Sequence, residues 1–168
     1  SAASDVYKRQ HLKSIINRFV EKSGVKEPLS VKIQTNLPPS RGLGSSAAVA
    51  VAFVRASYDF MDQPLDDKTL IKEANWAEQI AHGKPSGIDT QTIVSNKPVW
   101  FKQGQAETLK SLKLNGYMVV IDTGVKGSTK QAVEDVHVLC ESDEYMKYIE
   151  HIGTLVHSAS AVSYTHLT

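Results

Sequence analysis

Pro38–Ala48, the stretch PPSRGLGSSAA, carries the most information about the fold of this 168-residue chain. It follows a segment with strand-like alternation and precedes an alanine- and valine-rich segment typical of a helix. Its glycines allow positive φ and a close approach of the backbone to a ligand. Backbone N–H groups and the helix dipole at such a junction favour one anionic group. The alternative is an ordinary helix start with a serine N-cap, and the stretch alone does not decide between them.

The surrounding pattern mixes helices with strands. Apolar residues recur at helical spacing over residues 12–20, and Gly24 follows as a stop. Residues 29–33 alternate between apolar and polar, which predicts a half-buried strand. The other expected elements are a helix over 46–61, a helix from Asp66 or Asp67 to His82, a hairpin of 92–94 with 99–101, a strand over 117–122, a helix from Ser128 or Thr129 to Glu141, and a helix over 143–159. Because the mixture has no strict βαβ period, it favours an α+β fold over a doubly wound sheet.

Composition excludes several classes of protein. The net charge is +1 and Lys and Arg are scattered, so we expect no nucleic-acid surface. The longest apolar run, Ala47–Val54, is far shorter than the roughly 20 residues of a membrane-spanning helix, so we expect no membrane partner. Cys140 is the only cysteine, which excludes an internal disulfide and fits a reducing cytoplasm.

Glu78 is the first candidate for chemistry. It shares a helix face with Ile71, Ala74 and Ala81, so the spacing directs its carboxylate toward the core or a cleft. Burial of a carboxylate is costly unless a cation or hydrogen-bond donors compensate it. The alternative is that Glu78 sits at the edge of the apolar stripe and reaches water.

Asp89 is the second candidate. It follows a stiff, tightly turned segment that contains Gly83, Pro85 and Gly87, and it is well placed to accept a proton or to orient a hydroxyl. A carboxylate that caps the turn through its own backbone is the alternative. A third loop, Lys126–Thr129, is a candidate to face a phosphate or a carboxylate. The alternative is that it only caps the next helix.

Together these motifs resemble the GHMP kinase superfamily. Pro38–Ala48 matches the superfamily signature, in which a proline is followed after a short gap by Gly-Leu-Gly-Ser-Ser-Ala. Residues 83–90, GKPSGIDT, and residues 122–129, DTGVKGST, resemble the bacterial mevalonate kinase branch. The resemblance covers about residues 11–161. It implies a ribosomal-protein-S5-like N-terminal ATP-binding domain over 11–125, followed by the start of a ferredoxin-like C-terminal domain over 126–161.

The resemblance also implies an activity and site residues. The activity is ATP-dependent phosphorylation of the primary hydroxyl of mevalonate, a step of isoprenoid biosynthesis. Asp89 matches the catalytic aspartate, which accepts or positions the hydroxyl proton, and Ser46 and Glu78 match the Mg²⁺ ligands. The residues that match the ATP-binding turn are Pro38, Gly42, Leu43, Gly44, Ser45, Ser46, Ala47 and Ala48. A homodimer stays an open alternative to a monomer.

We expect the chain to be an internal fragment of a longer protein. Residues 1–10 and 162–168 do not continue the neighbouring patterns and are expected to be non-native tails. The family's N-terminal lysine and its glycine-rich third motif would lie outside residues 11–161. Missing strands would leave a sheet edge and core surface exposed. We therefore predict that the isolated chain folds poorly and has little or no kinase activity.

Two rival functions stay open. One is another small-molecule kinase of the superfamily, with phosphomevalonate kinase the nearest. The other is a nucleotide-binding or regulatory module that kept the fold and lost catalysis. The joint presence of Ser46, Glu78 and Asp89 favours a catalyst.

Overall fold

The computed structural model describes residues 2–38, 41–83, 85–102, 104–109, 117, 119–122 and 129–165. For residues 2–11, 81–82, 129–130 and 160–165 it gives the course of the backbone alone. Contacts divide the chain into two units, 1–110 and 111–168. The sequence-based domain boundary after Val125 falls among residues 123–128, which lie outside the described part.

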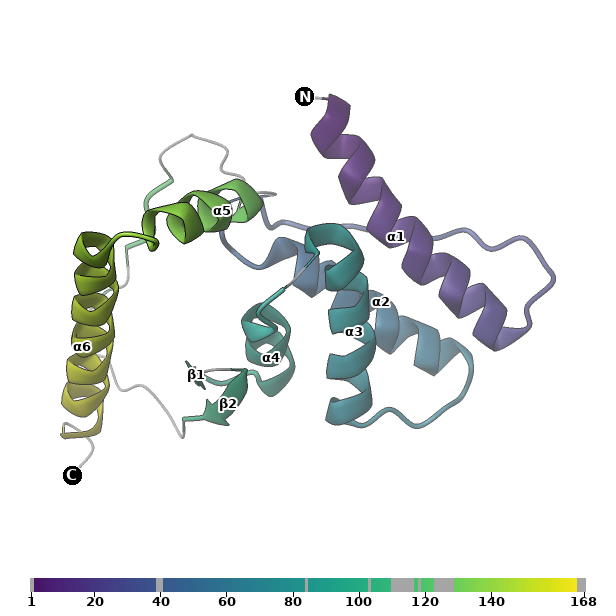
Figure 1. Ribbon diagram of the computed structural model, residues 1–168. Helices are drawn as coiled ribbons and strands as arrows, with labels where there is room; N and C mark the ends of the chain where they lie inside the picture. Colours follow the sequence, from purple (N-terminus) through teal and green to yellow (C-terminus); the bar gives the residue numbers. More distant parts are fainter. Residues whose placement is uncertain are drawn as a thin grey trace. The chain divides into compact units, whose positions relative to one another are not determined.

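The first unit is built mainly of helices (Figure 1). Its elements are α1 (Ala2–Ser23), α2 (Ser45–Phe60), α3 (Asp67–His82), α4 (Ile88–Ser95), β1 (Val99–Lys102) and β2 (Gln105–Thr108). α3 contacts α1, α2 and α4, and α4 also contacts α2 and the hairpin. The second unit contains α5 (Thr129–Leu139) and α6 (Asp143–Thr165). Helices with a small antiparallel sheet confirm the predicted α+β class.

Small residues on the facing sides of α2 and α3 make the core. Ala50 and Val51 of α2 pack against Ala74 and Ala77 of α3, and each is at most 1% exposed. Alanines lose little side-chain entropy and let two helices approach closely. The other members of the core are Ile15, Val54, Leu70 and Val94. Four helices therefore share one apolar centre, which fixes the beginnings of α2 and α4 relative to α3.

Local signals explain where α3 begins and ends. Asp66 is its N-cap, and the side-chain Oδ1 accepts the Thr69 N–H at 2.6 Å. That backbone hydrogen bond holds the pKa of the Asp66 carboxyl below its usual value. Gly83 ends the helix at φ 78°, in the left-handed region that favours glycine. The predictions for this helix are confirmed, as are those for the helices over 12–20, 46–61 and 143–159.

The predicted hairpin of residues 92–94 with 99–101 is wrong. Residues 92–94 belong to α4, where the Thr92 hydroxyl donates back to the Ile88 carbonyl oxygen at 2.8 Å. The hairpin lies further along the chain, with Val99 paired to Thr108 and Lys102 to Gln105. A short apolar β-branched run does not distinguish a buried helix from a strand. Burial of Val94 in the helical core decides the matter.

The predicted strands over 29–33 and 117–122 are also not strands among the described residues. Leu29, Val31 and Ile33 are 39%, 43% and 42% exposed, and Val119–Ile121 are more than 70% exposed. A strand forms only where its N–H and C=O groups pair with a neighbour. The described part of the chain pairs neither segment, so the alternating sequence pattern has no ladder to join.

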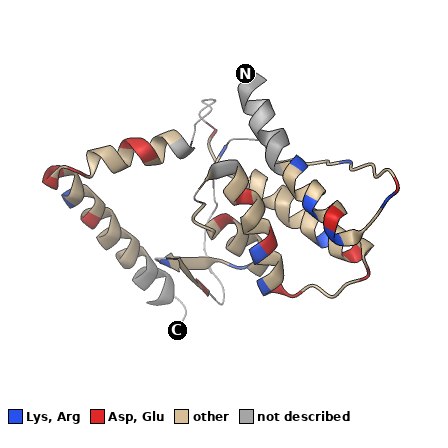
Figure 2. Ribbon diagram, turned by 45° about the vertical axis from the view of Figure 1, so that its right-hand side comes forward, with Lys and Arg blue, Asp and Glu red and all other residues tan. Residues whose placement is uncertain are grey.

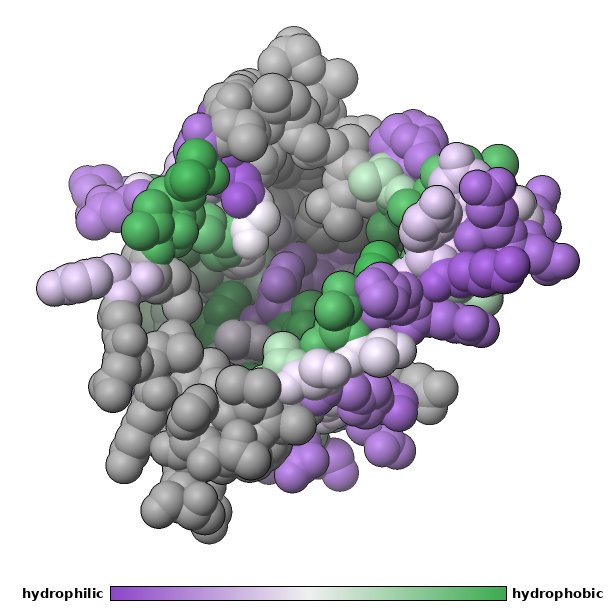
Figure 3. Space-filling model, turned by 90° about the vertical axis from the view of Figure 1, so that its left-hand side faces the viewer, coloured by the Kyte–Doolittle hydropathy of each residue, from purple (hydrophilic) through white to green (hydrophobic). Residues whose placement is uncertain are grey.

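Apolar side chains stay at the surface of the described residues (Figure 3). On α6 they include Tyr148, Ile152 and Leu155, each more than half exposed. Apolar side chains at the surface are what we expect where core surface is left uncovered. Poor folding and low activity of the isolated chain stay predictions. Residues 2–10 and 162–165 continue α1 and α6, so no break in secondary structure marks the expected tails. No helix in the described ranges is both long and apolar enough to cross a membrane.

Candidate active site

The glycine–serine stretch opens α2 through its backbone. Gly44 is the N-cap at φ 62°, and no side chain hydrogen-bonds to the first turn as a cap. The first helical bond runs from the Ala48 N–H to the Gly44 carbonyl oxygen at 2.9 Å. A serine N-cap is therefore wrong, because Ser45 and Ser46 already lie inside the helix. The N–H groups of residues 45–47 have no partner within the helix, which leaves them directed at the space beyond its end.

Ser46 and Glu78 meet across the α2–α3 contact. The Ser46 hydroxyl donates to Oε1 of Glu78 at 2.7 Å. Glu78 is 6% exposed, beside the fully buried Ala74 and Ala77. The apolar-face prediction for this carboxylate is confirmed, and the alternative, in which it reaches water, is wrong. Two residues that are 32 positions apart in the sequence thus form one partly buried oxygen pair.

Asp89 lies against Gly44. A methyl group on Gly44 would sit 3.8 Å from both the Cβ and the Cγ atom of Asp89. Asp89 belongs to the first turn of α4, which begins at its N-cap Gly87 with φ 84°. Its carboxylate is exposed. The start of α2 and the side chain of Asp89 are therefore neighbours, and it is the positive φ of Gly44 that favours glycine at this position.

The oxygen pair has the chemistry expected for Mg²⁺. This ion prefers oxygen ligands at 2.0–2.1 Å in an octahedron, so two neighbouring ligands are about 2.9 Å apart. The 2.7 Å between the Ser46 and Glu78 oxygens is close to that spacing. No group of three or more His, Cys, Asp and Glu side chains gathers in the described part of the chain. Mg²⁺ held by one or two protein oxygens plus phosphates and water does not need such a group.

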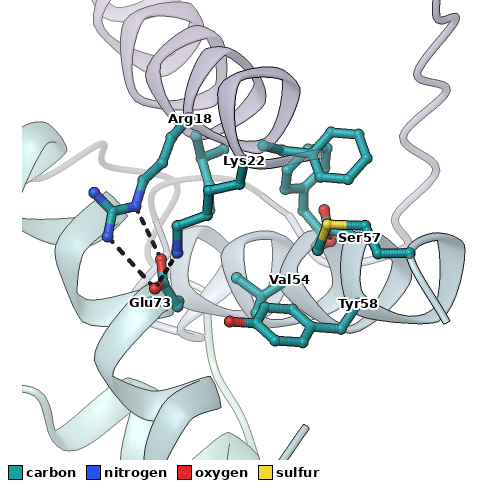
Figure 4. Close-up of a pocket in the computed structure, with 10 residues that line it drawn as sticks. Arg18, Lys22, Val54, Ser57, Tyr58 and Glu73 are labelled. Carbon is teal, nitrogen blue, oxygen red and sulfur yellow. Dashed lines mark hydrogen bonds and ion pairs between the residues drawn. The ribbon is translucent and has the colours of Figure 1, made fainter. Parts of the chain in front are cut away.

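Sequence reasoning missed a second charged cluster, at the α1–α3 contact (Figure 4). Glu73 of α3 accepts from Arg18 Nε at 3.0 Å and from Lys22 Nζ at 2.6 Å. The Arg18 guanidinium also lies 4.5 Å from the centre of the Trp76 ring. Burial raises the pKa of the Glu73 carboxyl, but the two cations outweigh it and hold that pKa below its usual value.

The cavity beside Glu73 does not suit a nucleotide. Its volume of about 20 Å³ is close to that of a single water site, and its walls are largely apolar. Figure 2 shows that Lys and Arg positions of the first unit alternate along the ribbon with Asp and Glu positions. The cluster at Glu73 joins α1 to α3, and none of Ser46, Glu78 and Asp89 lines its cavity.

Some of the remaining sequence candidates lie in the described part of the chain and others lie outside it. Pro38, Gly42 and Leu43 precede the helix, and Leu43 is 44% exposed. Pro39, Ser40, Lys84 and residues 123–128 lie outside the described residues, and with them most of the third loop. Sequence reasoning also missed Asn75, whose amide lies beside Gly87. Its position three residues before Glu78, on the same helix face, was the available signal.

Comparisons with known proteins bear on this arrangement. Residues 10–96 match the model of the GHMP kinases N terminal domain, a range that contains Ser46, Glu78 and Asp89. The mevalonate kinase of Aeropyrum pernix is 35% identical over 133 residues, which is 77% of this chain and 40% of that protein. The mevalonate kinase of Pyrococcus abyssi is 32% identical over 154 residues, 90% of this chain and 45% of that protein.

A solved structure is similar along most of the chain. The crystal structure of mevalonate kinase from methicillin-resistant Staphylococcus aureus MRSA252 is 63% identical, with a TM-score of 0.73. The match covers 93% of this chain and 50% of that one. The chain thus spans about half the length, or less, of the proteins it matches.

Proposed function

The chain belongs to the GHMP kinase family, and from this premise we propose that the full-length protein phosphorylates the primary hydroxyl of mevalonate with ATP. The observation that carries the proposal is the meeting of three sequence-distant groups at one place. The free end of α2, the Ser46–Glu78 oxygen pair and the Asp89 carboxylate come from three different helices. The relatives named above are mevalonate kinases.

Each group has a role in the proposed reaction. The N–H groups at the start of α2 bind the phosphates of ATP. Ser46 and Glu78 hold Mg²⁺, which supplies positive charge beside the phosphates when bound. The hydroxyl oxygen of mevalonate bonds to the γ-phosphorus, the bond from that phosphorus to the β–γ bridging oxygen breaks, and ADP leaves. The hydroxyl proton passes to the Asp89 carboxylate. Such a transfer needs positioning and charge neutralisation rather than a covalent nucleophile.

The proposal extends to architecture and location. Residues 11–125 form the later part of the N-terminal domain and 126–161 the start of the C-terminal domain. The family match over 10–96 supports the first assignment. The protein acts in the cytoplasm, in line with its single cysteine. The same step places it in isoprenoid biosynthesis.

The test uses the full-length protein in an ADP-release assay with mevalonate and, separately, phosphomevalonate. We expect turnover with mevalonate. Asp89→Asn keeps the size of the side chain and removes the base, so kcat should fall by roughly 10²–10⁴-fold while ATP binding is kept. Asp67→Asn is the matched control, because Asp67 is also an exposed acid in the first turn of a helix.

Two results would contradict the proposal. A preference for phosphomevalonate would assign the protein to the neighbouring kinase of the superfamily. ATP binding without turnover on any alcohol would make it a nucleotide-binding module.

A further inference from the structure

Asn75 connects α3 to the turn that begins α4. Its half-buried side chain reaches Gly87, where a methyl group would lie 3.4 Å from Nδ2 and 3.8 Å from Oδ1 of Asn75. Gly87 adopts φ 84° and is the N-cap of α4, two residues before Asp89. These are ordinary van der Waals distances, so the amide of Asn75 lies beside the backbone of the turn at this point.

The Asn75 amide is energetically unfavourable if its role is packing alone. Its Oδ1 is buried and has no hydrogen-bond partner among the described residues. A buried polar atom without a partner costs about 1–3 kcal/mol. A leucine has a similar volume and would carry no such cost. Such an atom in a folded protein calls for an explanation other than stability.

Asp89 has neighbours on two sides, although the residue is exposed. On one side its Cβ and Cγ lie against Gly44 at the start of α2. On the other side the chain enters α4 through Gly87, whose carbonyl oxygen accepts the Gln91 N–H at 3.0 Å in the first helical bond. A shift of the turn at Gly87 would move the Asp89 carboxylate relative to the end of α2.

We infer that Asn75 is a positioning residue for Asp89: its amide fixes the turn at Gly87 and thereby the place of the carboxylate. The inference rests on the proposed kinase activity for its kinetic consequence. Its structural half, the fixing of α4 by Asn75, can be measured without any substrate.

The experiment uses the full-length protein with Asn75→Ala, and Asn75→Leu as a second variant that keeps the volume of the side chain. Lys72→Ala is the control, since Lys72 is exposed on the same helix one turn earlier. Three quantities are measured: kcat with KM for ATP and mevalonate, thermal unfolding, and hydrogen exchange of the Gln91 amide. That amide reports whether the Gly87 carbonyl is held in place.

We expect kcat of Asn75→Ala to fall on the order of 10- to 100-fold, as for a catalytic group displaced by about 1 Å. Both KM values should stay within about two-fold of wild type. Exchange at Gln91 should become faster while the amides of α2 keep their rates. Asn75→Leu should lose kcat without a lower melting temperature, because it removes the unpartnered atom and disturbs the flat contact with Gly87.

Wild-type kcat and wild-type Gln91 exchange in both variants would overturn the inference. A lower kcat with unchanged exchange at Gln91 would also overturn it, since Asn75 would then act on the substrate directly. Uniformly faster exchange throughout α2–α4 would also overturn it, because Asn75 would then stabilise the whole unit and not the turn at Gly87 in particular. If wild type lacks turnover with mevalonate, the proposed function fails, and the Gln91 exchange still decides whether Asn75 holds the turn.

Discussion

Glu78 and Glu73 lie on the same helix, α3. Replacing Glu78 by glutamine should lower activity and leave stability nearly unchanged, whereas replacing Glu73 should lower stability and leave activity unchanged. Glu78 is buried, and its Oε1 accepts a hydrogen bond from the hydroxyl of Ser46 at 2.7 Å. Glu73 is fixed by two cations, Arg18 and Lys22. Glu73 therefore has the surroundings of a structural ion pair, whereas Glu78 lies against the hydroxyl of Ser46, the other proposed Mg²⁺ ligand.

The magnitudes follow from these contacts. Glu78→Gln exchanges a charge-assisted hydrogen bond for a neutral one, a loss of about 1 kcal/mol. It also relieves the desolvation of a buried charge, which is of at least that size. The free energy of unfolding should therefore stay within about 1 kcal/mol of wild type, or rise. Loss of a Mg²⁺ ligand should lower kcat/KM by at least 10²-fold, roughly what mutations around a metal cost.

Glu73→Gln is the matched comparison. It removes the charge to which Arg18 and Lys22 bind, at a cost of about 1–2 kcal/mol for two partly exposed pairs. Because none of Ser46, Glu78 and Asp89 lines the cavity beside Glu73, kcat per folded molecule should match wild type.

The measurements are urea unfolding, and the rate of ADP release at several Mg²⁺ concentrations, on the full-length protein. Excess Mg²⁺ should restore part of the lost rate in Glu78→Gln. The reasoning fails if Glu78→Gln keeps its activity and loses more than about 2 kcal/mol of stability. Glu78 would then be a structural acid like Glu73.

Two further predictions concern acid stability and the Gly44 turn. Because folding lowers the pKa of Glu73, its ion pairs should stabilise the protein fully above the pKa of an unfolded glutamate, about 4.3. They should lose this effect as the pH falls through the lower folded value. The free energies of unfolding of wild type and Glu73→Gln in urea should therefore converge on acidification, and a difference that grows would refute this. Gly44→Ala places a side chain at φ 62° and against Asp89, so it should cost about 1 kcal/mol of stability and raise the KM for ATP; Gly24→Ala, at φ 66° with open space around it, should show the stability loss alone.

Apart from α4, the helices of the first unit could be predicted from the sequence because their signals are local. Asp66 and Gly83 delimit α3 through contacts with its own first and last turns. Glu78 could be placed on the apolar face because the period of 3.6 residues orients side chains without knowledge of partners. The resemblance then grouped Ser46, Glu78 and Asp89 as one site, a grouping that no spacing in the sequence reveals.

The errors fall where structure depends on a distant partner. Residues 92–94 have strand-like composition, yet the core around Val94 holds them in a helix. Residues 29–33 alternate as a strand should, and no described segment pairs with them. β-structure is completed by hydrogen bonds between separate segments, so an alternating run determines a face and not a neighbour.

In the glycine–serine stretch, some features follow from the local sequence and others from contacts with distant segments. Its composition alone determined that a helix begins there with a turn of positive φ, because glycine allows what other residues resist. The tertiary structure decided that Gly44 and not a serine is the cap, that the Ser46 hydroxyl faces Glu78, and that Asp89 lies against Gly44. These contacts join α2, α3 and α4, and packing around a shared core is what brings their ends together.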